Sequence, residues 1–185
     1  MQITTDEIKR IDQFTSDLLN LSKRSTQVME TDINELIKTL LFFVSYQFKV
    51  SNVKCQTELG DIPEIRVNPF ELGQAILNIL NNAIEAMSSG GILSIKTHKD
   101  LLFGKEFVFL EISDTGPGIA SEQQRRVDAP HPNEKGKGFG LLISRKIIEN
   151  HGGNLLIESK KGVGTSVCIC LPVSCKGETN ESSKE

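Results

Sequence analysis

Hydrophobic residues at the start of the chain recur with the spacing of amphipathic helices. In the first stretch they lie three or four residues apart with charged residues between them, at Ile8, Ile11, Phe14, Leu18 and Leu21. Thr4 with Glu7 predicts a capping box for this helix, and Asp32 with Glu35 predicts a second helix that runs to about Phe48. The first stripe is compatible with a dimerisation seam or with a face packed on the main domain.

The middle of the chain changes from a strand pattern to a helix pattern. Apolar positions that alternate between residues 53 and 59 predict a strand. Asn68, Pro69 and Glu71 supply a capping side chain, a proline at the first helical position and an acidic first turn. These signals predict a helix that runs to about Met87.

The pattern in the second half of the chain predicts strands and one further helix. The pattern predicts strands over 92–97 and 107–114, antiparallel to each other, a helix over 141–151, and strands over 154–159 and 165–171. These elements predict an α+β fold, a two-layer sandwich in which about three helices cover one face of a four- or five-stranded mixed sheet. A helical arm precedes it.

Composition restricts the class of protein. The chain has 185 residues, 38% hydrophobic and 24% charged, with a formal net charge of -3. We therefore expect no nucleic-acid partner, because such proteins usually carry a clustered basic face. No apolar run is long enough to cross a bilayer, and no signal peptide opens the sequence. We expect a cytoplasmic protein without direct membrane insertion of this chain, and leave open whether a full-length protein is membrane-anchored.

The predicted organisation has three parts. Residues 1–30 form the helical arm, residues 31–173 form the main domain, and the polar residues 174–185 form a disordered tail.

Four cysteines lack the paired spacing of metal or redox sites. Cys168 and Cys170 alternate on one strand face, where we expect them to lie in the core.

One face of the helix that begins at Pro69 is polar. Its members recur at steps of three and four residues, at Glu71, Gln74, Asn78, Asn82 and Glu85. This stripe either faces water or forms the wall of a polar cavity. In the second case, the asparagine carbonyls are suitable ligands for Mg²⁺, which shares the oxygen atoms of a phosphate with its protein ligands.

A carboxylate ends the strand predicted over 107–114. Asp114 continues the apolar face of that strand, so it is expected at the rim of the core. Gly116 and Gly118 follow it and allow a ligand to approach the backbone closely. A carboxylate in an apolar slot accepts a hydrogen bond from the amine of adenine and disfavours guanine, which presents an oxygen there.

Two further glycine-rich segments have the composition of ligand-binding loops. Gly136, Gly138 and Gly140 alternate just before a predicted helix, where free backbone N–H groups and the helix dipole favour an anion. A flexible loop is an equally good interpretation of this run taken alone. Gly164 and Thr165 fit a tight hairpin as well as a ligand contact.

Taken together and in this order, four segments resemble the N, G1, G2 and G3 boxes of the histidine-kinase ATPase superfamily, whose members share the Bergerat nucleotide-binding fold. They are 78–83, 114–118, 136–141 and 164–165. The residues before about position 22 resemble the second helix of the dimerisation and phosphotransfer hairpin that precedes such domains. The resemblance implies the ATP-binding catalytic domain of a two-component sensor histidine kinase, with ATP and Mg²⁺ as ligands.

The resemblance also implies roles for individual residues. Asn82 would bind Mg²⁺, and Asn78 would line the phosphates or assist the metal. Asp114 would recognise the amine of adenine, and Thr165 would contact the same end of the base through a water molecule. The remaining members of the implied nucleotide site shape the purine slot, bind phosphates or hinge the lid: Gly116, Gly118, Gly136, Gly138, Gly140 and Leu141. Lys135 and Lys137 are either phosphate contacts or solvated loop lysines.

The chain differs from the family pattern in ways that bear on its activity. Hydrolytic members of the superfamily carry a glutamate at the position of Asn78, and an amide cannot act as a general base. None of the histidines His98, His131 and His151 lies in an acceptor-like context, so the phosphoacceptor is expected outside this partial chain. The segment before Gly136 lacks the usual aromatic anchors of the lid.

The expected partners are a response regulator receiver domain in the complete protein and, through the arm, a second copy of the chain. Two alternatives remain open: a protein serine kinase of the anti-sigma-factor type, and a catalytically degenerate nucleotide-binding dimeric scaffold.

Overall fold

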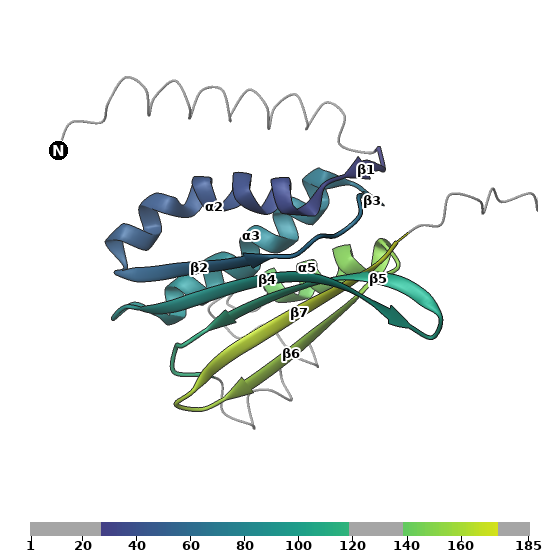
Figure 1. Ribbon diagram of the computed structural model, residues 1–185. Coiled ribbons are helices and arrows are strands. Elements are labelled where there is room, and N and C mark those ends of the chain that lie inside the picture. The colour runs from purple at the N-terminus through teal and green to yellow at the C-terminus, as the bar shows by residue number, and fades with distance from the viewer. Residues whose placement is uncertain (1–26, 119–138, 174–185) are drawn as a thin grey trace, which may run out of the picture.

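The computed structural model describes residues 27–118 and 139–173. The elements in this part of the chain are β1 (Met29–Thr31), α2 (Ile33–Val50), β2 (Val53–Leu59), β3 (Ile65–Val67), α3 (Pro69–Ala86), β4 (Gly91–Leu102), β5 (Lys105–Asp114), α5 (Phe139–Asn150), β6 (Asn154–Lys160) and β7 (Gly164–Pro172) (Figure 1). The expected N-terminal helix, most of the glycine-rich segment before Phe139 and the polar tail lie outside the described residues.

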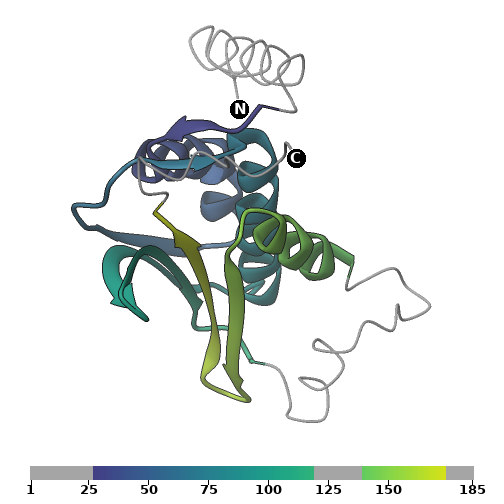
Figure 2. The ribbon, with the colours of Figure 1, turned by 90° about the vertical axis from the view of Figure 1, so that its right-hand side faces the viewer.

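The main sheet has five strands in the order β2-β4-β5-β7-β6. β2 pairs with β4 in parallel, whereas the other neighbours are antiparallel. Helices α3 and α5 pack against each other on one face of this sheet, and α2 packs on α3 and β2 (Figure 2). The two-layer α+β sandwich predicted from the sequence is therefore confirmed.

Two short strands were not predicted. β1 pairs antiparallel with β3, and each is three residues long, too short for a visible alternation pattern. β1 spans the domain boundary expected between residues 30 and 31.

The helix signals in the sequence act as predicted. The side chain of Asp32 accepts hydrogen bonds from the backbone N–H groups of Asn34 and Glu35 at the start of α2. Asn68 caps α3 in the same way, through the N–H groups of Phe70 and Glu71. None of the helices among the described residues is long and apolar enough to cross a membrane.

The core lies between the sheet and the helices. Inward-facing residues of β4, β5 and β7 meet buried residues of α3 there, among them Leu93, Ile95, Val108, Leu110, Ile112, Ile169, Leu171, Leu72, Ile76, Ile79 and Leu80. Leu110 pairs with Ile169 in the register, which places Cys168 and Cys170 on the opposite, helix-free face. Cys170 is nevertheless buried, as predicted, whereas Cys168 is only partly buried. Both sets of alternating residues in β7 are apolar, and only the strand partners decide which set faces the helices.

The β4–β5 hairpin is longer than predicted and carries an unfavourable turn. β4 continues to Leu102, and the turn residues Phe103 and Gly104 have φ angles of 53° and 77°. Two successive positive φ angles are typical of a type I′ turn, in which asparagine is preferred at the first position. Phe103 is 98% exposed, so no packing compensates for its backbone conformation.

We expect Phe103→Asn to stabilise the protein by about 1 kcal/mol, because asparagine tolerates the left-handed conformation that an aromatic residue does not. Urea denaturation followed by circular dichroism measures the change in the free energy of unfolding. Leu101→Asn, two residues away in extended backbone, serves as a control for the loss of an exposed apolar side chain. An equal gain in both variants would attribute the effect to surface polarity and not to the turn.

Candidate functional site

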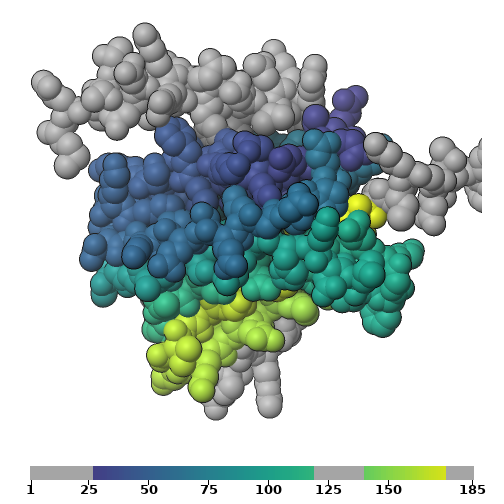
Figure 3. Space-filling model, viewed as in Figure 1, coloured from purple at the N-terminus to yellow at the C-terminus, as the bar shows by residue number. Residues whose placement is uncertain are grey.

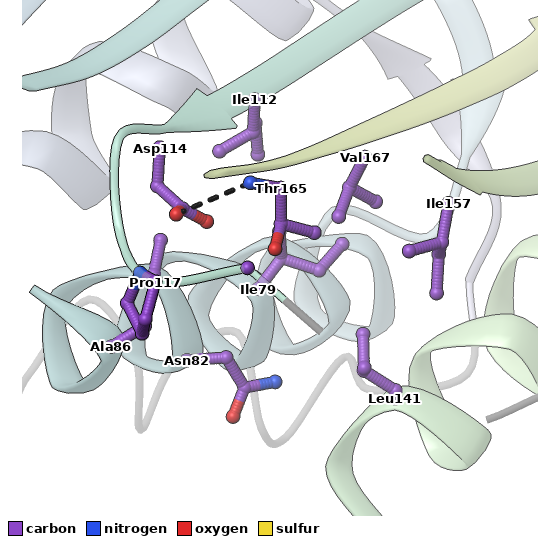
Figure 4. Close-up of a pocket in the computed structure, with 12 residues that line it drawn as sticks. Ile79, Asn82, Ala86, Ile112, Asp114, Pro117, Leu141, Ile157, Thr165 and Val167 are labelled. Carbon is purple, nitrogen blue, oxygen red and sulfur yellow. Dashed lines mark hydrogen bonds between the residues drawn. The ribbon is translucent and has the colours of Figure 1, made fainter. Parts of the chain in front are cut away.

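A cavity lies between α3, α5 and the end of the sheet formed by β5, β6 and β7 (Figure 4). Its lining is mostly apolar, with polar groups from Asp114, Thr165 and Asn82. The residues that line it are Ile79, Asn82, Ala83, Ala86, Ile112, Asp114, Pro117, Gly118, Leu141, Ile157, Thr165 and Val167. The structure thus brings together one residue or more from each of the four sequence segments identified above.

Asp114 lies at the end of β5, where its carboxylate faces the cavity. Its Oδ1 accepts hydrogen bonds from the backbone N–H groups of Gly116, at 2.8 Å, and Thr165, at 3.3 Å. Among the described residues, no hydrogen-bond partner is seen for Oδ2. Burial raises the pKa of Asp114, and the two N–H groups oppose that shift. One carboxylate oxygen is therefore fixed by the backbone, and the other remains for a ligand that donates a hydrogen bond.

Thr165 pairs with Asp114 in the β5–β7 register. Its hydroxyl lies 2.9 Å from the hydroxyl of Ser159 on β6, which also donates to the carbonyl of Gly164 at 3.1 Å. Ser159 therefore fixes the hydroxyl of Thr165 at the edge of the cavity. Ser159 was not predicted, because its contribution depends on the β6–β7 register.

Two glycines let the loop after Asp114 pack on the β6–β7 hairpin. A Cβ on Gly164 would lie 1.9 Å from the carbonyl oxygen of Asp114, and one on Gly118 would lie 2.2 Å from that of Lys160. Both glycines have positive φ, 142° and 66°. The N–H of Gly162 donates to the carbonyl of Pro117 at 2.7 Å. These close backbone contacts set the position of Asp114 relative to Thr165.

The opposite wall of the cavity is α3. Asn82 projects from it toward the cavity, as Figure 4 shows, and Asn78 lies one turn earlier on the same face. The amide nitrogen of Asn78 reaches the carbonyl of Gly140 at 3.5 Å. Ser144, fully buried in α5, donates to the carbonyls of Gly140 at 2.9 Å and Ala75 at 3.2 Å. The first turn of α5 is thereby held against the asparagine face of α3.

His151 connects the end of α5 to the start of α3. The N–H of Asn68 donates to its Nε2 at 2.9 Å, and its Nδ1 lies 2.7 Å from the carbonyl of Ile147. Because an N–H only donates and a carbonyl only accepts, the ring is neutral with its proton on Nδ1. Its backbone N–H also donates to the carbonyl of Ile147. The ring therefore bridges the end of α5 and the start of α3 as a neutral group.

We expect His151→Ala to destabilise the protein by about 1–3 kcal/mol, because it removes the hydrogen bond that the N–H of the buried Asn68 donates to the ring. The His151 side chain is 5% exposed, so water does not replace the lost bond without rearrangement. His98→Ala on the open face of the sheet is the matched control, with an expected loss below about 1 kcal/mol. Equal losses in guanidinium denaturation would contradict the bridging role.

The structure describes some, but not all, of the residues that the sequence predicts to bind the nucleotide. Asn78, Asn82, Asp114, Gly118, Leu141 and Thr165 lie in or beside the cavity. Gly116 packs against Asp114 and Ala86, and Gly140 contacts Asn78. Lys135, Gly136, Lys137 and Gly138 lie outside the described residues.

The apolar walls of the cavity were not predicted from the sequence. Ile112 lies two residues before Asp114 and Val167 two residues after Thr165, so strand alternation from these polar residues could have found both. Ile157 is on a neighbouring strand, and Ala86 lies one turn after Asn82. Only the folded chain places these two beside the carboxylate.

The arrangement is suited to a flat, largely apolar group with an N–H donor at one edge. Such a donor would meet the carboxylate of Asp114, and the isoleucine, valine and alanine side chains that line the cavity would pack on the faces of the group. The neutral amides of Asn78 and Asn82 lie on the helix opposite the sheet. Amide oxygens that share a helix face are suitable ligands for a hard cation that also binds phosphate oxygens.

Comparison with known proteins identifies relatives along nearly the whole chain. Sporulation kinase E of Bacillus subtilis (strain 168) is 34% identical over an alignment of 186 positions, which covers 98% of this chain and 25% of that protein. Sensor histidine kinase ZraS of Escherichia coli (strain K12) is 30% identical over an alignment of 177 positions, which covers 94% of this chain and 37% of that protein. The chain thus spans well under half the length of these curated relatives.

Solved structures and a family profile agree with these relatives. The catalytic domain of histidine kinase ThkA superposes with a TM-score of 0.69 at 26% identity, covering 80% of this chain and 96% of that domain. The profile described as "Histidine kinase-, DNA gyrase B-, and HSP90-like ATPase" matches residues 67–174, more than half of the chain. The chain therefore belongs to the family of histidine kinase-, DNA gyrase B- and HSP90-like ATPases.

Proposed function

We propose that this chain is the ATP-binding catalytic domain of a two-component sensor histidine kinase. The observation that carries the proposal is the cavity in which the Asp114 carboxylate lies at one edge of an apolar slot, with Asn82 on the opposite wall. In this proposal, Oδ2 of Asp114 accepts a hydrogen bond from the amine of adenine. Thr165 supports the same end of the base, and Gly116 and Gly118 shape the loop beside it.

The phosphates would extend along α3 toward the first turn of α5. Asn82 would hold Mg²⁺ through its amide oxygen, with Asn78 lining the phosphates beside it, and the bound ion would neutralise phosphate charge. Asn78 and Ser144 together hold Gly140 near this path. The contributions of Gly136, Gly138, Lys135 and Lys137 to phosphate binding stay predictions, since these residues lie outside the described part of the chain.

We infer that the γ-phosphoryl group passes to a histidine that this chain does not supply. Of the two described histidines, His151 is buried with both ring nitrogens engaged. His98 stacks on Phe109 on the helix-free face of the sheet. Neither residue lines the cavity. An external phosphoacceptor also explains why α3 carries Asn78 where a water-activating carboxylate would otherwise be expected.

The proposed downstream partner is a response regulator receiver domain. One solved structure with the same fold is histidine kinase ThkA in complex with response regulator protein TrrA, at 23% identity.

A degenerate nucleotide-binding scaffold is the second candidate function, because the segment 119–135 lacks aromatic residues. The two candidates differ in turnover: only a kinase phosphorylates an added histidine-bearing helical hairpin from a related kinase.

Calorimetric titration of ATP and GTP, each with and without Mg²⁺, tests the nucleotide assignment. We expect magnesium-assisted binding of ATP and at least tenfold weaker binding of GTP, whose oxygen would face the Asp114 carboxylate. Equal binding of the two nucleotides would overturn the adenine assignment. Absence of binding by either would leave the scaffold as the better proposal.

Asn82→Ala is expected to remove the Mg²⁺ dependence of ATP affinity, because the substitution deletes the proposed metal ligand without changing the apolar slot. The measurement is the ratio of ATP dissociation constants with and without Mg²⁺. Gln74→Ala, two turns earlier on the polar face of α3, is the matched control and should keep the wild-type ratio. A retained Mg²⁺ dependence in the Asn82 variant would place the metal site elsewhere.

A further inference from the structure

A groove of about 420 Å³ lies between the C-terminal ends of α2 and α3. α2 is at the molecular surface, at the upper left of Figure 3. The lining includes Tyr46, Val50 and Ser51 from the end of α2, and Asn81, Glu85 and Ser88 from the end of α3 and the residues after it. None of these residues lines the nucleotide cavity. The groove is therefore a separate recess on another face of α3.

The groove has a negative electrostatic character. Glu85 is the single charged residue of its lining, and its exposed carboxylate forms no ion pair within the described part of the chain. Because both helices end at the groove, their dipoles add partial negative charge there. α3 has no basic residue in its last turn, and Lys49 in the last turn of α2 does not line the groove. The groove therefore favours a positively charged occupant.

The groups around Glu85 favour a planar cation with several N–H donors. Tyr46, which is 65% exposed, supplies an aromatic ring. Asn81, one turn before Glu85, has a side-chain oxygen without a hydrogen-bond partner in the described structure, and the hydroxyls of Ser51 and Ser88 are further acceptors. A guanidinium group stacks on an aromatic face while its in-plane N–H groups donate to a carboxylate. An ammonium group has no planar face, so arginine fits these groups better than lysine.

The exposure of the groove indicates what carries the guanidinium group. Tyr46 and Val50 are 65% and 67% exposed. A free small cation would leave most of this apolar rim in water, whereas small-molecule sites usually bury most of the ligand surface. A protein partner covers the rim with its own surface while one of its side chains fills the groove. Tyrosine and arginine are both enriched in such interfaces.

We propose that this groove binds an arginine side chain of a partner protein. The guanidinium group stacks on the ring of Tyr46 and pairs with the carboxylate of Glu85, and the methylene groups of the arginine pack on Val50. This gives a role to Glu85, a member of the polar stripe of α3 that does not line the nucleotide cavity. The proposal is independent of the nucleotide assignment, because the groove and the cavity share no lining residue.

Tyr46 reports on this site directly, because it is the single tyrosine of a chain without tryptophan. The probe is the capped peptide acetyl-Leu-Arg-Leu-amide, titrated into the full chain while tyrosine fluorescence is recorded. We expect a saturable change in fluorescence, and roughly threefold weaker binding of acetyl-Leu-Lys-Leu-amide, which has the same charge without the planar face. Glu85→Gln should weaken binding of the arginine peptide roughly fivefold, because it removes the charge of the acceptor.

Glu64→Gln is the matched control. Glu64 is also exposed and without an ion pair in the described structure, and it precedes β3 near the opposite end of α3. This variant should bind the arginine peptide like the wild type. Equal losses in the two variants, equal affinity for the two peptides, or no change in fluorescence would each overturn the proposal. Binding of methylguanidinium as tight as that of the arginine peptide would overturn the assignment to a protein partner.

Discussion

Asp114→Asn is expected to weaken ATP binding by roughly 5- to 150-fold, the equivalent of about 1–3 kcal/mol. The backbone geometry determines the reason. The N–H groups of Gly116 and Thr165 both donate to Oδ1, so the introduced amide must place its oxygen there. Its NH₂ group then takes the position of Oδ2 and presents a donor to the amine of adenine. Calorimetric titration measures the change in ATP affinity.

The stability of the Asp114→Asn variant separates a binding defect from a folding defect. Burial raises the pKa of Asp114 in the folded protein above its ordinary value. Above that folded pKa, the ionised carboxylate therefore lowers stability, and this cost disappears as the pH falls through the folded pKa toward the unfolded value. At neutral pH the uncharged asparagine should leave the unfolding midpoint unchanged or raise it. Weak ATP binding with a lowered midpoint would point to misfolding, and unchanged ATP affinity would contradict the adenine assignment.

Gly164→Ala is expected to destabilise the protein by about 3 kcal/mol or more and to abolish ATP binding. The new Cβ would lie 1.9 Å from the carbonyl oxygen of Asp114, a fixed backbone atom. The strands β5 and β7 must separate there to admit it. That separation would break the Thr165–Asp114 hydrogen bond and displace both polar residues at this edge of the cavity. Thermal denaturation and ATP titration measure the two effects.

Gly162→Ala is the matched control in the same hairpin. Gly162 also has a positive φ, 79°, but a Cβ there meets no atom within 4 Å. Its substitution should cost only the backbone strain, about 1 kcal/mol, and should preserve ATP affinity. Similar losses of stability and binding in both variants would show that backbone conformation, and not the close approach at Gly164, limits this part of the site.

Local signals in the sequence predicted most of the fold. Asp32 and Asn68 cap helices through bonds to backbone N–H groups two and three residues ahead, so their effect depends on neighbouring residues alone. Strand alternation placed Asp114 on the inward face for the same reason. The prediction failed where a second segment decides the outcome, as for the short β1–β3 pair.

The sequence by itself determined which residue types are available to the site and on which side of its own element each one lies. Asn78 and Asn82 share a face of α3 because an α-helix repeats every 3.6 residues, and Asp114 follows the apolar face of β5 because a strand repeats every two. Only the tertiary structure decided which atoms meet. The fixing of Asp114 Oδ1 by Thr165, the orientation of Thr165 by Ser159, and the neutral bridge of His151 each join residues from separate elements. Strand register and helix packing set these contacts, and no local periodicity encodes either.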